Sequence, residues 1–326
     1  MQIFSNPNYD FIRWRWYALS LSLLVIAAGL VAMATRGLPL GIDFSGGTVV
    51  VMQFERSVSE EQVRNAVNGL PGEKVVQQFG NPADRQVMIR LPQAEGVEQG
   101  ASLEQGSRQI EQALRQAGLP KFDVVKRELV GPVIGQDLQR RGIYATLTSI
   151  LAITIYIGWR FRFSFAVGAI AATFHDIFVT IAFLTFFGYD LSLNVVAALL
   201  TITGYSVNDT IVIFDRVREN LRSMRREGLD HVVNLSVNQT LSRTIITAGT
   251  TFLSVLSLYV FGGEVLRGFA FTMLVGVISG TYSTVFIASA IAIILSQRKR
   301  RTAVVTATET PADQSRRSKQ GKARAS

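Results

Sequence analysis

An aspartate inside a long apolar stretch is the residue of this sequence best suited to chemistry. Asp209, in GYSVNDTIVIFDR, lies six residues before the charged Asp215, and hence about 9 Å inside the polar boundary of a helix that rises 1.5 Å per residue. Tyr205 and Thr201 precede it at four-residue steps, which predicts one polar stripe on a helix face, and Asn208 adds an amide beside it. A central aspartate costs a membrane helix roughly 2.5–3.5 kcal/mol, so by default it marks a functional site.

Arg243 is the candidate partner of Asp209. It lies near the start of the next apolar run, in LSRTIITAGTTFLSV, and an antiparallel helix pair would bring the two side chains together. Burial disfavours the charged form of a carboxylate unless a cation lies nearby. A carboxylate that meets Arg243 in one state and a wet cavity in another would bind and release a proton, as in a proton relay. The alternative is that Asp209 and Asn208 only join helices by hydrogen bonds.

His175 and Asp176, in AATFHDIFVT, form a second polar pair inside an apolar run. Neighbouring residues point about 100° apart on a helix, so we expect that the two side chains do not face the same spot. One would face the run that carries Asp209 while the other bonds elsewhere. A structural role in hydrogen bonding is favoured over a direct role in proton transfer, although both stay open.

The composition indicates a membrane protein without a metal site or cofactor. Of the 326 residues, 48% are hydrophobic and only 17% are charged, below the roughly 25% typical of soluble domains. The chain has no cysteine, and its two histidines, His175 and His231, are far apart, which argues against thiolate and histidine-rich metal sites. The net charge of +9 fits basic cytoplasmic loops better than nucleic-acid binding.

Six apolar runs are long enough to cross a bilayer, for which about 20 residues suffice. In chain order they are 17–34, 142–159, 163–187, 191–214, 244–261 and 269–295. The first run lacks a small-residue cleavage site, so we interpret it as a retained anchor rather than a signal peptide. Residues 1–16 precede it. The polar, basic stretch 296–326 is expected to be a disordered tail.

The positions of the basic residues predict the orientation. Arginine and lysine gather before the first run, between the second and third, between the fourth and fifth, and after the sixth. The connections 188–190 and 262–264 contain none. Basic loops face the cytoplasm, so both termini are expected there, in a multi-pass protein of the bacterial inner membrane.

The long insert 36–141 is expected to form one α+β domain on the far, periplasmic side. Its pattern predicts strands and helices in the order βαββαβ, that of a ferredoxin-like fold. Ser59 and Gln62 have the spacing of a capping box for the first of these helices. The predicted elements are strands at 48–54, 75–79, 86–91 and 122–130, and helices at 59–70 and 102–117. The predicted fold is thus an α-helical membrane protein with six spans. One periplasmic domain lies between the first and second spans, and the last five spans form a block at 142–295.

Four motifs together resemble the SecF family, the smaller membrane subunits of the bacterial SecDF complex, within the resistance-nodulation-division superfamily. They are GIDFSGGTVV after the first span, ELVGPVIGQDL before the second, GYSVNDTIVIFDRVREN in the fourth and LSRTIITAGTTFLSVLSLYVFGG in the fifth. The resemblance extends from the first span to the sixth. It includes a motif at the junction of the first span and the insert, which contributes Asp43, Gly46 and Gly47.

The resemblance implies a function in protein export that depends on partners. It implies pairing with SecD, a second six-span half, into a twelve-helix unit that associates with the SecYEG translocon, with YajC as a further candidate partner. Such a unit uses the proton-motive force to help pull preproteins across the membrane, in contact with membrane lipids. The family's proton-conducting aspartate and arginine correspond to Asp209 and Arg243, and the partner aspartate lies in SecD.

Two other functions are weighed against this one. A small-molecule/proton antiporter of the same superfamily usually carries twelve spans and two inserts in one chain, about twice the length here. An intramembrane aspartyl protease would use Asp176 and Asp209, but neither lies in a GxGD motif, and no HExxH motif occurs. We therefore expect a transport component rather than an enzyme.

Overall fold

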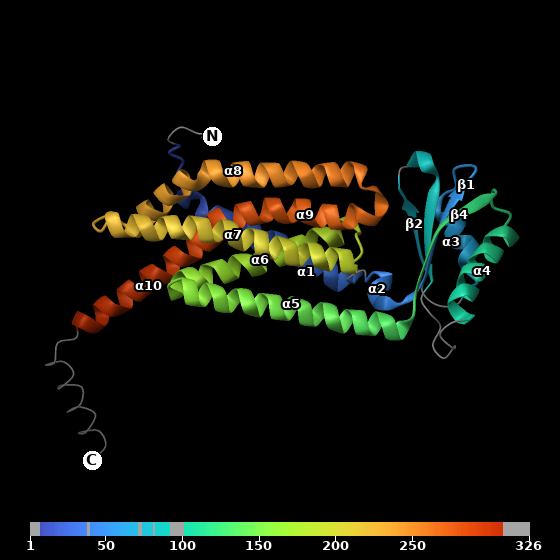
Figure 1. The fold of residues 1–326 in the computed structure, drawn as a ribbon, viewed down its shortest axis with the longest axis horizontal. Helices are drawn as coiled ribbons and strands as arrows, with labels where there is room; N and C mark the ends of the chain where they lie inside the picture. Colours follow the sequence, from blue (N-terminus) through green and yellow to red (C-terminus); the bar gives the residue numbers. More distant parts are fainter. Residues whose placement is uncertain (1–6, 38–39, 71–73, 81, 92–100, 309–326) are drawn as a thin grey trace, which may run out of the picture.

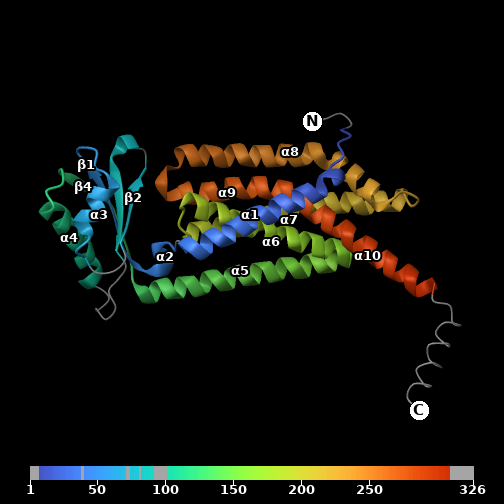
Figure 2. The ribbon, with the colours of Figure 1, turned by 180° about the vertical axis from the view of Figure 1, so that it is seen from behind.

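The structure, a computed structural model, describes residues 7–37, 40–70, 74–80, 82–91 and 101–308. It is elongated, with a bundle of long helices joined to a small sheet domain at one end (Figures 1 and 2). The elements are η1 (Ile12–Trp14), α1 (Arg15–Arg36), α2 (Ile42–Ser45), β1 (Gly47–Phe54), α3 (Glu60–Val67), β2 (Val75–Phe79), η2 (Pro82–Asp84), β3 (Gln86–Leu91), α4 (Ala101–Gln116), β4 (Phe122–Val130), α5 (Pro132–Arg160), α6 (Phe163–Phe187), α7 (Leu193–Ser223), α8 (Leu229–Phe261), α9 (Gly263–Ser283), the π-helical segment η3 (Thr284–Ala288) and α10 (Ser289–Thr308).

Within the described residues, six helical stretches are long and apolar enough to cross a membrane, which confirms the predicted fold class. Several helices extend well beyond the apolar runs. Helix α5 begins at Pro132, α7 continues to Ser223, and α8 begins at Leu229. Hydropathy detects only the part of a helix that fits the bilayer, so these polar extensions escape it.

The last apolar run is divided between α9, η3 and α10, and α10 continues through Thr308, where the sequence predicts a disordered tail. The rest of that tail, 309–326, lies outside the described residues. In Figure 1, the described chain begins and ends at the end of the bundle that lies away from the sheet domain. The sheet domain therefore projects from one end only.

The sheet domain has the ferredoxin-like order that the sequence predicts. Its four strands are all antiparallel neighbours in the order β2-β3-β1-β4, and α3 and α4 lie on one face. Alternate residues of β1, namely Val50, Met52 and Phe54, pack against these helices in one apolar core. The capping box at Ser59 and Gln62 is confirmed, with both of its hydrogen bonds present.

The opposite face of the sheet is turned toward the helical bundle. Val49 and Val51 of β1 and Met88 of β3 line a cavity of about 640 Å³ that lies between the sheet and the bundle. Within the described residues, the strands and the two helices of the sheet domain pack little against the long helices. The link between the two parts runs through α2, which packs on α5.

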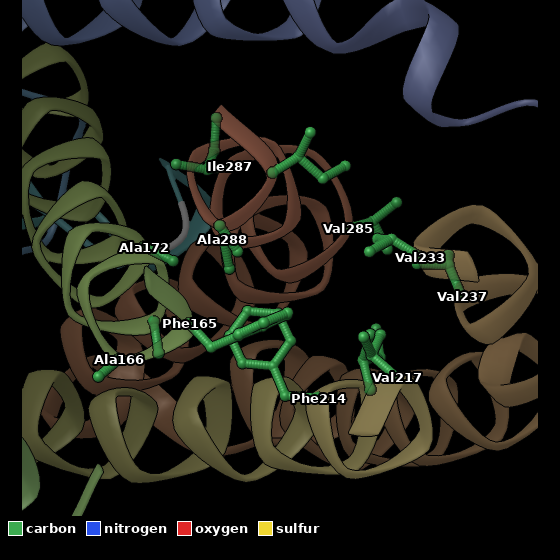
Figure 3. Close-up of a cluster of buried hydrophobic side chains, with 14 of the residues drawn as sticks. Phe165, Ala166, Ala172, Phe214, Val217, Val233, Val237, Val285, Ile287 and Ala288 are labelled. Atoms are coloured by element: carbon green, nitrogen blue, oxygen red, sulfur yellow. The ribbon is translucent and has the colours of Figure 1, made fainter. Parts of the chain in front are cut away.

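Helix α9 occupies the centre of the bundle, where it contacts α6, α7 and α8. A large apolar cluster joins α6, α7, α8 and the η3–α10 region, and Figure 3 shows Phe165 and Phe214 facing each other beside Ala288. Their rings are 5.0 Å apart in an edge-to-face arrangement, a favourable geometry for aromatic pairs. Helices α5 and α8 lie at opposite edges of the bundle (Figure 1) and leave most of their apolar surface exposed.

Candidate functional site

Helix α7 positions the polar residues of the GYSVNDT segment. The side chain of Ser192 caps its start by accepting a hydrogen bond from the amide of Val195, and the helix then continues unbroken to Ser223. Asp209 is buried, Tyr205 is half-buried, and Asn208 is exposed. The predicted single stripe is therefore divided between the interior and the outer face.

Thr201 lies on the outer face of α7. It is exposed, and its hydroxyl donates to the carbonyl of Ala197 in its own helix at 2.8 Å. Eight residues turn an α-helix by about 80° beyond two full turns, so Thr201 no longer shares the face of Asp209. Tyr205, four residues from Asp209, instead interacts with Thr247 and Thr251 of α8.

Asp209 meets α8 through Thr244 rather than through an ion pair. The Thr244 hydroxyl donates to Oδ1 of Asp209 at 2.8 Å. The other carboxylate oxygen, Oδ2, is buried and has no hydrogen-bond partner among the described residues. An isolated, buried carboxylate oxygen is costly to leave charged, because nothing replaces the water that it has lost.

Arg243 lies next to Thr244 on α8 and is exposed. Its charge interacts with that of Asp209 through space, but no ion pair within 4 Å joins them among the described residues. The antiparallel arrangement of α7 and α8 thus brings the predicted pair near each other and leaves a gap between them.

Asp176 has quite different surroundings. Its carboxylate is almost fully buried and accepts hydrogen bonds from Ser206 of α7 at 2.6 Å, and from Ser279 and Ser283 of α9 at 2.7 and 2.8 Å. His175 provides a fourth contact, between Nδ1 and Oδ1, at 3.0 Å. Asp176 therefore ties its own helix, α6, to both α7 and α9.

The contact between His175 and Asp176 corrects one sequence expectation. Their backbones do diverge on α6, yet the side chains bend toward each other and meet. The other ring nitrogen of His175 lies 2.9 Å from the Ser22 hydroxyl of α1, and that hydroxyl donates to Tyr282. The ring thereby connects Asp176 to the first span, which favours a structural role for His175.

Sequence reasoning missed the serines that surround Asp176. Ser279 and Ser283 are one helical turn apart on α9, in the same segment as Gly276 and Gly280. A Cβ on Gly280 would lie 3.0 Å from the Cβ of Ser206, which shows how closely α7 and α9 approach. A four-residue serine spacing beside a GxxxG pair is the signal that could have indicated this cluster.

The junction motif connects the first span to the sheet domain. Gly46 and Gly47 have φ angles of 67° and 119°, in the region that favours glycine, and the chain turns there into β1. Asp43 accepts a hydrogen bond from the backbone N–H of Leu193, the first residue of α7, at 2.8 Å. The motif therefore also holds the start of the helix that carries Asp209.

The outer faces of α7 and α8 carry further polar and small residues. On α7, exposed positions recur with heptad spacing at Asn194, Ala197, Thr201, Gly204 and Asn208. On α8 the corresponding exposed positions are Thr247, Thr250, Ser254 and Ser257, one turn beyond Arg243. Small and polar residues are typical of surfaces that pack against other membrane helices.

Two family descriptions match the chain, and together they cover most of it. "Protein export membrane protein SecD/SecF, C-terminal" matches residues 109–298, and "SecD/SecF GG Motif" matches residues 31–58. The first includes all but one of the long helices, and the second includes the junction motif.

Curated relatives are similar over nearly the whole chain. The protein translocase subunit SecF of Desulfurispirillum indicum is 44% identical over 283 residues, which cover 86% of this chain and 89% of the relative. The SecF subunit of Escherichia coli O157:H7 is 40% identical over 292 residues, 89% of either chain.

Two solved structures share the fold. The crystal structure of SecDF from Thermus thermophilus, a translocon-associated membrane protein, superimposes with a TM-score of 0.79 at 34% identity, and it covers 90% of this chain. SecDF in a super-membrane-facing form gives a TM-score of 0.69, also at 34% identity, over 94% of this chain. This chain spans only 39% and 41% of the lengths of those two.

Proposed function

Because the chain belongs to the SecF family of protein translocase subunits, we propose that it couples proton flow across the bacterial inner membrane to late-stage preprotein translocation. In this proposal it acts with SecD beside the SecYEG translocon. The sheet domain lies in the periplasm, both termini lie in the cytoplasm, and YajC and membrane lipids are additional contacts. The chain contributes one half of the proton path.

The surroundings of Asp209 are the observation that carries this proposal. One carboxylate oxygen has a single donor, Thr244, and the other is buried without a hydrogen-bond partner among the described residues. A proton on that free oxygen removes the charge that burial disfavours. Loss of the proton restores the charge and favours a closer approach of Arg243. Asp209 and Arg243 are therefore the proposed relay residues.

The outer faces of α7 and α8 support a partner surface at this site. The exposed hydroxyls of these faces donate to carbonyls of their own helices, so it is the small size of their side chains, together with the exposed amide of Asn208, that favours close packing against a second helical half. We assign these faces to SecD. Asn208 and Thr201 would then bind across the interface, while Tyr205 supports the α7–α8 contact. His175 and Asp176 hold the bundle together rather than carry protons.

The energy of one proton suggests that the two states are nearly balanced. One charge moved through 100 mV yields about 2.3 kcal/mol. Reversing a two-state equilibrium from 1:99 to 99:1 requires about 5.5 kcal/mol. A single proton is therefore sufficient only when the two arrangements of α7 and α8 differ little in free energy, and the gap between Asp209 and Arg243 is consistent with such an arrangement.

The test is Asp209→Asn in the full chain assembled with SecD, with proton-driven export into inverted membrane vesicles as the readout. We expect export to lose its dependence on the proton-motive force while assembly with SecD is retained. Asp215→Asn is the matched control. It makes the same chemical change on the same helix, but at a residue that pairs with Arg160 at 2.7 Å near the end of α5. Full proton-driven export by Asp209→Asn would show that the relay assignment is wrong.

A further inference from the structure

The connection between α6 and α7 is held by the segment that leads into the sheet domain. The backbone N–H of Gly41 donates to the carbonyl of Leu191 at 2.8 Å, and Leu40 and Leu191 form a parallel β-bridge. A Cβ on Gly41 would lie 3.0 Å from that same carbonyl oxygen, so only glycine permits this approach without displacement. The two segments are therefore in direct backbone contact.

Arg90, on β3, bonds to both sides of this contact. Its guanidinium pairs with the Asp190 carboxylate in the α6–α7 connection, and Nη1 also donates to the carbonyl of Leu40 at 2.9 Å. The side chains of Arg90 and Asp190 are only 11% and 21% exposed. A planar guanidinium is suited to such a double contact, because its donors point in fixed directions. Arg90 thus links the sheet to the membrane helices.

Asp43 provides a second link, directly to α7. Its carboxylate accepts the N–H of Leu193, one of the amides that the first turn of a helix leaves without an internal partner. A negative charge there also complements the positive end of the helix dipole. Asp43 lies on α2, which packs against α5 and leads through Gly46 and Gly47 into β1. The start of α7 is therefore attached to the sheet domain from two directions.

These two links stand out because the sheet domain makes few other contacts with the bundle. Between the inner face of the sheet and the bundle lies the cavity of about 640 Å³, which Asp43, Arg90 and Asp190 border. The two links therefore lie at the margin of the space that separates the sheet from the bundle. Helix α7 is continuous from Leu193 to Ser223 and carries Asp209, so a shift at Asp209 displaces the attached end as well.

We propose that Arg90 and Asp43 are positioning residues of a joint that transmits displacement of α7 to the sheet domain. The joint consists of Leu40, Gly41, Asp43, Arg90 and Asp190–Leu193. This proposal rests on the proposed function, in which the charge state of Asp209 changes the packing of α7. It adds the path by which that change leaves the membrane.

Pairs of spin labels test the joint in the full chain assembled with a cysteine-free SecD. This chain has no cysteine, so engineered cysteines are its only labelling sites. One pair, Gln116→Cys and Phe261→Cys, measures the distance between α4 of the sheet domain and the end of α8. A second pair, Trp159→Cys and Arg222→Cys, measures the distance between α5 and α7. Each distance is compared between the parent protein and Asp209→Asn.

We expect Asp209→Asn to shift both distances in the intact joint. In Arg90→Met, and in Arg90→Met combined with Asp43→Asn, the α5–α7 shift should persist. The sheet-domain shift, which is the change in the α4–α8 distance, should fall to less than a third of its size in the intact joint. The distribution of that distance should also broaden. Arg127→Met is the matched control, because it removes an ion pair with Glu111 at 2.5 Å that lies wholly within the sheet domain. It should leave both shifts unchanged.

Arg90→Lys guards against misfolding of Arg90→Met, because it keeps a positive charge beside the partly buried Asp190. An ammonium group lacks the planar fork of arginine, so we expect an intermediate sheet-domain shift. A sheet-domain shift that survives in full in the Arg90→Met variants would overturn the joint. So would a sheet domain that does not respond to Asp209→Asn while α7 does. A failure of α7 itself to respond would count against the proposed function instead.

Discussion

Asp176 and Asp209 lie on neighbouring helices of the same bundle, and their carboxylates have opposite surroundings. Asp176 accepts four side-chain hydrogen bonds, from Ser206, Ser279, Ser283 and His175. Asp209 accepts one, from Thr244, and its second oxygen has no partner among the described residues. Burial alone therefore does not distinguish a carboxylate that holds helices together from one that is proposed to exchange a proton. The number of hydrogen-bond donors does, because each donor helps to hold a buried carboxylate in place.

The same contrast extends to the packing of the two regions. Asp176 lies where α6, α7 and α9 approach closely, and Gly168 of α6 sits against the backbone of η3. Asp209 lies against α8, much of whose surface is exposed. A rigid region and a loosely packed one share α7.

Replacement of Asp176 by leucine should have the largest effect on stability. Interhelical hydrogen bonds in membranes contribute roughly 0.6–1 kcal/mol each, so loss of the four bonds should cost about 2–4 kcal/mol. Thermal unfolding of the purified chain in detergent measures this. Asp209→Leu is the comparison, because it removes only one such bond and should cost less than about 1 kcal/mol. Equal losses of stability in the two variants would contradict a structural role for Asp176 that Asp209 does not share.

Adding a methyl group to a glycine in each region should give a smaller difference in stability between the two regions. In Gly168→Ala, the new Cβ would lie 2.5 Å from the carbonyl oxygen of Ala288, a backbone atom that cannot turn aside. Overpacking of this kind costs about 1–3 kcal/mol. In Gly249→Ala on α8, no atom beyond the local backbone of the helix lies within 4 Å of the new Cβ, and the gain in helix propensity should stabilise the chain by up to about 1 kcal/mol.

The same unfolding measurement tests this pair of variants. Opposite signs of the change in unfolding temperature would support a tightly packed α6–η3 contact and an open α8 surface. If Gly249→Ala destabilised the isolated chain as much as Gly168→Ala, α8 would be more closely packed than its surroundings indicate.

Sequence reasoning succeeded where a local pattern determines the structure. Helix α6 begins and ends with the apolar run 163–187, and strands β2, β3 and β4 have the predicted bounds. The proximity of Asp209 and Arg243 also followed, because two antiparallel helices joined by a short connection leave few alternatives.

The contacts that sequence reasoning missed depend on tertiary packing. Asp176 is 103 residues from Ser279, and Arg90 is 100 residues from Asp190. No periodicity in the sequence links positions so far apart. Thr244 was overlooked for a different reason, since its neighbour Arg243 has the charge that draws attention. The hydroxyl nevertheless makes the direct contact with Asp209.

Asp190 is a third carboxylate, and it lies outside the membrane-spanning helices. We expect its effect on the free energy of unfolding to be the smallest of the three. Burial raises the pKa of the Asp190 carboxyl above its ordinary value, while the Arg90 guanidinium beside it acts in the opposite direction. The native state therefore holds this proton more tightly than the unfolded chain. The free energy of unfolding that Asp190 contributes is complete below the ordinary value, about 4, and is lost as the pH rises through the raised native pKa.

Arg90→Met removes the opposing cation and should raise the pKa of Asp190 further. The variant should then lose stability with rising pH over a wider interval above pH 4 than the parent does. Unfolding temperatures measured across that interval test this, with Arg90→Met combined with Asp190→Asn as the control, because the amide does not titrate. If the pH dependence of the two variants were the same, the proton would not reside on Asp190. A steeper loss in Arg90→Met alone would show that the Arg90 guanidinium stabilises the charge of Asp190 in the native state.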